Sequence, residues 1–147
     1  MNSDFTTILG NGINSIITEL QQYENETDIW NIEGEIKNSA GNLAFHLTGS
    51  INYFIGAVMA NNGYVRNRDA EFSDKNISRE KMISELNTTK TMMEEFISKQ
   101  DVDFYNAIFP LQTFGENRSN HYALMIIAVH LNYHLGQINY HRRLIGK

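Results

Sequence analysis

Apolar residues recur every three or four positions in four long segments of this chain, and this spacing restricts the fold more than any other feature. In residues 4–23 the recurring apolar side chains are Phe5, Ile8, Leu9, Ile13, Ile16, Ile17, Leu20 and Tyr23. This spacing gives a helix one apolar face. Ser3 or Asp4 is available to cap the helix, whereas Gly10 and Gly12 weaken it.

Two further segments have the same pattern and clear start signals. We expect the second helix to start at Ser39 and to end at Asn61-Asn62-Gly63, with an apolar face formed by Leu43, Leu47, Ile51, Phe54, Ile55, Val58 and Met59. Ser78 caps the third helix, whose inward positions are Met82, Leu86, Thr89, Met93 and Phe96. Residues 64–77 mix charged and polar side chains, which predicts a loop.

The fourth segment, residues 121–144, is the longest and is apolar on most sides, so we expect it in the centre of the fold. Ser119 or Asn120 can cap it. Residues 101–117 contain Pro110 and Gly115 and predict irregular structure. No segment alternates as a strand does, so the sequence predicts an all-α fold, a four-helix bundle with sites built from inward side chains on facing helices.

Length and charge restrict the domain count and the partners. With 147 residues, one proline and no linker-like stretch, the chain is expected to form one domain, residues 1–147. The net charge is −5 and the basic residues are scattered apart from Arg142-Arg143, which argues against nucleic acid as a partner. The N-terminus lacks a secretory signal, and the longest apolar run is too short to span a membrane. We therefore expect a soluble cytoplasmic protein.

Histidines are the strongest candidates for chemistry, because the chain has no cysteine and any metal site must use nitrogen and oxygen donors. His130 and His134 lie four positions apart, which places both imidazoles on one face of the fourth helix. Two such rings can bind one divalent ion. The spacing alone is a weak motif, since it also arises by chance.

Two further residues, His46 and Gln137, are interpreted from their positions relative to neighbouring side chains. His46 lies in the apolar face of the second helix, one turn from Asn42 and Ser50, and on its own reads as a core histidine held by hydrogen bonds. Gln137 lies one turn beyond His134, where its amide could hold an imidazole or a bound water, or could simply be solvated.

Two histidines are expected outside the site. His141 is about 10 Å along the helix axis from His134, too far to share an ion, so we expect it at the surface or at the site's mouth. His121 starts the fourth helix and is expected to face solvent.

Two sequence segments together resemble a known family. His130-x-x-x-His134-x-Gly136-Gln137-Ile138, followed by Arg142-Arg143-Leu144, is similar to the last helix of the DinB-like family of bacterial four-helix-bundle metalloenzymes. Gly41-Asn42-Leu43-x-x-His46-Leu47-x-Gly49 is similar to the segment that supplies that family's first histidine, and Arg68-Asp69-Ala70-Glu71-Phe72 resembles a segment in one branch. The resemblance extends from about Asn38 to Leu144.

The resemblance implies that His46, His130 and His134 bind one divalent metal ion, zinc or nickel, with an open position for water or substrate, as in catalytic sites. Characterised relatives include enzymes that use low-molecular-weight thiols, so the implied activities are thiol S-transfer or small-molecule hydrolysis. The implied partner is then a small-molecule substrate such as a low-molecular-weight thiol. Asn42, Ser50 and Gln137 are candidate supporting or pocket residues. No catalytic acid or base can be named, although Glu71 is a candidate base if residues 64–77 fold over the site.

Two other hypotheses stay open. In the first, the protein is a non-catalytic metal-binding or stress-response protein whose site is closed by a fourth protein ligand. In the second, it is a helical bundle whose histidines only form hydrogen bonds in the core. The apolar faces of the first and third helices could also form a homodimer, although packing against the other helices explains them equally well.

Overall fold

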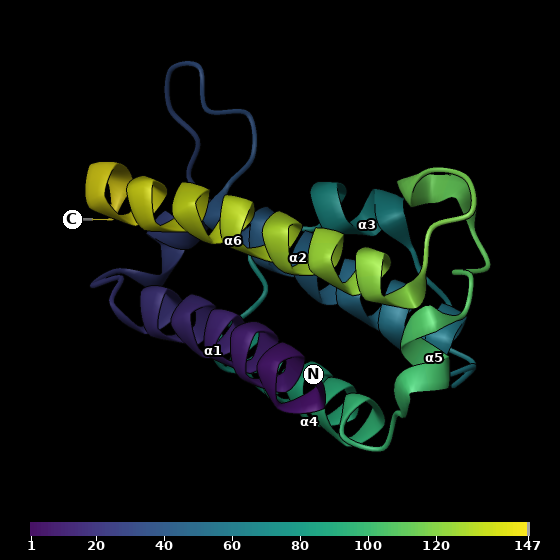
Figure 1. Ribbon diagram of the computed structural model, residues 1–147. Coiled ribbons are helices and arrows are strands. Elements are labelled where there is room, and N and C mark those ends of the chain that lie inside the picture. Colours follow the sequence, from purple (N-terminus) through teal and green to yellow (C-terminus); the bar gives the residue numbers. More distant parts are fainter. Residues whose placement is uncertain (147) are drawn as a thin grey trace.

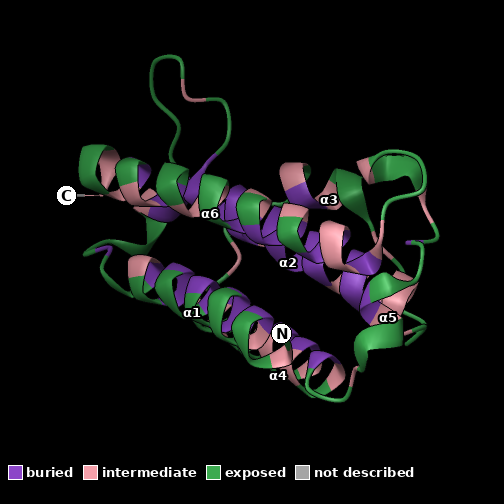
Figure 2. Ribbon diagram, viewed as in Figure 1, coloured by how far each residue is buried: buried purple, intermediate pink, exposed green. Residues whose placement is uncertain are grey.

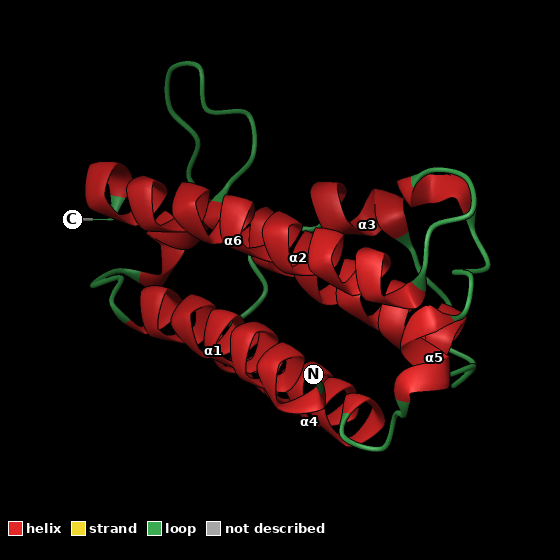
Figure 3. Cartoon of the chain, viewed as in Figure 1, coloured by secondary structure: helices red, strands yellow, loops and turns green. Residues whose placement is uncertain are grey.

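The computed structural model describes residues 1–146, which form helices and loops without a β-strand (Figures 1 and 3). The prediction of an all-α fold is therefore confirmed for this part of the chain. The four long helices are α1 (Asn2–Gln21), α2 (Ala40–Ile51), α4 (Arg79–Ile97) and α6 (Asn120–Ile145). The shorter elements are η1 (Glu26–Trp30), η2 (Asn52–Met59), α3 (Arg68–Ser73), α5 (Val102–Asn106) and η3 (Gln112–Phe114).

Three of the long helices begin at a serine cap that the sequence predicts. The hydroxyls of Ser39, Ser78 and Ser119 accept the backbone N–H three residues ahead and so satisfy one free donor in the first turn of each helix. The prediction of a Ser3 or Asp4 cap for α1 was wrong, because the helix already begins at Asn2, without a side-chain cap.

The long helices contact one another around a closed ring. α1 packs against α4 and α6, and α2 packs against the same two helices. Their buried residues face the interior and their exposed residues face outward (Figure 2). α1 and α6 approach so closely that a Cβ on Gly12 would collide with Leu131. The ring leaves α2 and α6 side by side, and their facing surfaces carry the histidines of interest.

Several segments differ from the prediction. The predicted second helix continues beyond α2 as the π-helix η2, and residues 64–77 contain the short helix α3 instead of a continuous loop. Residues 101–117 include α5 and η3. α6 is not central, since its outer face exposes Met125, Val129, Tyr133, Tyr140 and Leu144. Apolar composition alone therefore overstated how many sides of this helix are covered.

His141 is buried, with 3% of its surface exposed, which corrects the prediction of a surface position. The Tyr23 hydroxyl donates to Nδ1 over 2.6 Å, and Nε2–H donates to the Asn31 carbonyl over 2.8 Å. The residues after α1 thus return across the C-terminal half of α6 and cover this ring. His121 also departs from the prediction, because it is half-buried against Phe5 and Tyr105.

None of the helices within residues 1–146 combines the length and the apolar character needed to cross a bilayer.

The buried imidazole of His141 predicts an acid-sensitive contribution to stability. Burial lowers the pKa of His141 from its ordinary value of 6.5. Below about pH 6.5 the unfolded chain gains a proton that the folded chain resists, so the free energy of unfolding falls as the pH falls. In urea unfolding of metal-free protein, H141N should be less stable than wild type by about 1–3 kcal/mol at pH 7, because it loses both hydrogen bonds.

The same variant should lose less stability than wild type between pH 7 and pH 5. An equal loss in H141N and wild type would contradict the assignment.

Candidate metal centre

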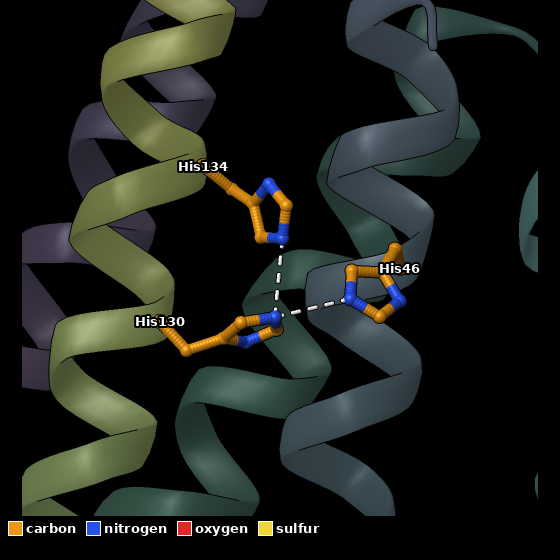
Figure 4. Close-up of side chains that lie close together, drawn as sticks. All are labelled: His46, His130 and His134. Atoms are coloured by element: carbon orange, nitrogen blue, oxygen red, sulfur yellow. Dashed lines mark hydrogen bonds between the residues drawn. The ribbon is translucent and has the colours of Figure 1, made fainter. Parts of the chain in front are cut away.

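Three histidines from two helices meet in the space between α2 and α6 (Figure 4). The Nε2 atom of His130 lies 3.1 Å from Nε2 of His46 and 3.1 Å from Nε2 of His134. One nitrogen from each ring lies within 4.8 Å of the others. His46 is buried, and His130 and His134 are half-buried. The structure therefore brings together the three histidines that the sequence singled out.

The outer nitrogens of two rings have hydrogen-bond partners that fix the tautomer. His46 Nδ1 lies 3.0 Å from Oε1 of Glu71, and His134 Nδ1 lies 2.6 Å from Oε1 of Gln137. Both partners are oxygen acceptors, so Nδ1 carries the hydrogen and Nε2 carries a lone pair. The lone pairs of His46 and His134 are thus directed toward the same point beside His130.

The Glu71 carboxylate is buried and makes three polar contacts. Arg66 donates from Nε to Oε2 and from Nη2 to Oε1, each over 2.8 Å, and His46 Nδ1–H donates to Oε1. A carboxylate on the outer nitrogen of an imidazole orients the ring and makes Nε2 a better ligand. Glu71 was a candidate base on the condition that residues 64–77 fold over the site, and they do. Because both of its oxygens are engaged away from the Nε2 atoms, Glu71 positions His46 instead.

Two residues of α2 determine where Glu71 lies. Gly49 lies under the Glu71 carboxylate, and a Cβ at this position would collide with it. Asn42 holds the backbone of the α3 segment, because its Nδ2 donates to the carbonyls of Glu71 (3.0 Å) and Asp74 (2.9 Å). Asn42 therefore supports the site by holding the α3 segment against α2.

Burial lowers the pKa of each imidazole in the cluster. The pKa of His130 falls to about 4, mainly because the ring is desolvated and further because His134 and His46 lie beside it. Burial also lowers the pKa of His46, although the hydrogen bond that its Nδ1–H donates to Glu71 opposes this shift. It lowers the pKa of His134 as well, against the opposing hydrogen bond donated to Gln137. All three rings are therefore neutral at pH 7, which is the state that binds metal ions.

The donor set fits a divalent ion. Ligand nitrogens about 2.0–2.1 Å from a tetrahedral zinc ion are about 3.3–3.4 Å apart, close to the 3.1 Å that separates Nε2 of His130 from Nε2 of His46 and from Nε2 of His134. Without an ion, a single N–H on His130 can satisfy only one of the two lone pairs directed at it. Among residues 1–146, no cysteine, carboxylate or other histidine joins this group of three.

A cavity of about 300 Å³ opens onto His46 and His130. Its apolar wall includes Phe54, Phe114 and Ile127, and its polar groups are Ser50, Thr113, Arg66 and Arg68. Ser50 thus lies at the pocket, whereas Gln137 contacts His134 from outside this cavity. Neither arginine is predicted as a site residue, because single basic residues in a predicted loop carry no spacing signal. Arg68 occurs only within the segment that resembles one branch of the family.

Comparison with known proteins assigns the chain to a family whose function is unknown. The family model described as protein of unknown function (DUF1572) matches residues 12–147, nearly the whole chain. No curated protein matches the chain.

Glu71 should control metal affinity through His46. E71Q keeps the size of the side chain but loses the charge that polarises the ring and neutralises Arg66, so the affinity for zinc should fall by about 10–100-fold. Competition with a chromophoric chelator at pH 7 measures this. E80Q, on the exposed face of α4, is the matched control and should bind as wild type does. An unchanged dissociation constant in E71Q would remove the positioning role.

Proposed function

We propose the function from the site itself, because the chain belongs to DUF1572, a family described as proteins of unknown function. In this proposal His46, His130 and His134 bind one divalent metal ion, zinc or nickel. The proposal depends on one observation: the Nε2 atoms of the three rings converge on one point. In two of the rings, an oxygen that accepts from Nδ1–H fixes the tautomer.

We propose further that the chain is a DinB-like metal-dependent enzyme. The ring of α1, α4, α2 and α6 supports its assignment as a four-helix bundle, and the resemblance around His46 and His130 supports the family relation. Three protein ligands beside a cavity are typical of catalytic sites, whereas closed four-ligand sites are typical of structural ones. These features favour an enzyme over a non-catalytic metal-binding or stress-response protein.

The proposed reaction is transfer of a low-molecular-weight thiol to an electrophile, with small-molecule hydrolysis as the second candidate. When bound, the ion would supply Lewis acidity and lower the pKa of a coordinated thiol or water. The chain has no cysteine, so the thiol would come from solution.

The chain's own residues have three roles in this proposal. Glu71 and Gln137 hold His46 and His134 in the neutral, ligating tautomer. Phe54 and Phe114 supply an apolar wall that limits water at the reacting centre. Ser50 and Thr113 offer hydroxyls to polar atoms of the substrate.

Metal content tests the proposal directly. Protein purified without a histidine tag should hold about one divalent ion per chain, and H130N and H134N should each weaken binding by more than about a hundredfold, because each removes a ligand. Inductively coupled plasma mass spectrometry and chelator competition measure both quantities.

H121N is the matched control, since it removes a histidine from the same helix, about two and a half turns before the cluster, and should bind the ion normally. If no metal binds under saturating zinc and nickel, the proposal is wrong, and the histidines only form hydrogen bonds in the core. Thiol-dependent turnover of model electrophiles that is lost on metal removal and restored on reloading would support the enzyme. Tight metal binding with no exchangeable position would favour the non-catalytic alternative.

A further inference from the structure

We propose that the cavity beside His46 and His130 takes a small ligand with an apolar body and a carboxylate, and that Arg68 binds the carboxylate. The inference rests on the proposed function, which supplies the metal ion that would bind the other end of the ligand. It adds the charge class of the substrate, which the three histidines do not determine.

The two arginines at this cavity differ in their charge balance. Arg66 gives two hydrogen bonds to Glu71, so its charge is neutralised within the protein. Arg68 forms no ion pair with any described residue. Its guanidinium lies 5.8 Å from the ring centre of Phe72, a cation–π contact that leaves its hydrogen-bond donors available.

Arg68 is held near the cluster by its aromatic neighbour. The Phe72 ring lies 5.0 Å from the His46 ring, and Arg68 lies over that Phe72 ring. Both Arg68 and His46 line the cavity. A ligand there can thus contact the guanidinium at one end and the histidine cluster at the other.

The charge of the cavity opposes that of the whole chain. Its described lining includes two arginines and no acidic residue, whereas the chain has a net charge of −5. With Glu71 balancing Arg66, the Arg68 charge remains, and a divalent ion would add to it. Such a pocket attracts anions and disfavours cations.

The walls and the volume limit the rest of the ligand. Phe54, Phe114, Ile126 and Ile127 form an apolar surface suited to a ring or a short hydrocarbon body. A volume of about 300 Å³ corresponds to roughly ten water molecules at about 30 Å³ each. The planar fork of arginine donors matches a carboxylate.

A matched pair of probes tests this inference. 3-Mercaptobenzoate and 3-mercaptobenzamide each have about ten non-hydrogen atoms and differ only in whether the group meta to the thiol carries a negative charge. Their affinities for cobalt-loaded protein are measured by titration, following the sulfur-to-cobalt absorption band and the heat of binding. Wild type should bind the carboxylate roughly tenfold more tightly than the amide, and the preference should shrink at high salt, because Arg68 is exposed.

The arginine variants assign the preference to one residue. R68Q should bind both probes nearly equally, R68K should keep part of the preference, and R143Q, an exposed arginine of α6 that does not line the cavity, should keep all of it. Cobalt affinity should be unchanged in all three, which also shows that they fold.

The outcomes separate this inference from the proposed function. Failure of wild type to bind cobalt would overturn both. Cobalt binding with equal affinities for the two probes, with no binding of either probe, or with a preference that survives in R68Q would overturn the Arg68 assignment alone.

Discussion

One buried carboxylate, that of Glu71, connects the parts of this molecule that matter most for the candidate site. It accepts two hydrogen bonds from Arg66 and one from His46. Glu71, in the short helix α3, therefore connects the loop that contains Arg66 to α2, which contains His46. A buried carboxylate is costly unless its oxygens are fully paired. That requirement explains why Gly49 leaves room for it and why Asn42 holds the backbone of α3 against α2.

The positions of the three histidine rings are determined in two different ways. His130 and His134 are one turn apart on α6, so helix geometry places both rings on one face, and Gln137 of the same helix orients the His134 ring. His46 comes from α2, and its ring orientation depends on Glu71 and Arg66. Two nitrogens of the cluster are therefore fixed locally, while the third depends on how the α3 segment folds over α2.

The sequence predicted those features that depend on local spacing. Apolar periodicity and serine caps located α2, α4 and α6, and the four-residue spacing of His130 and His134 placed both rings on one face. It failed where a partner is distant or an element is short. α3 has only six residues, too few for periodicity. His141 is covered by Tyr23 and Asn31, more than a hundred positions earlier in the chain.

The separation of the three histidines along the chain has a consequence for unfolding. His46 and His130 are 84 positions apart, so a cation held between them would act as a removable cross-link across most of the polypeptide. A cross-link of this kind favours the native state by the free energy of binding. Loss of the ion and separation of α2 from α6 would then be one coupled event, and the cell's supply of metal would influence how long the folded protein persists.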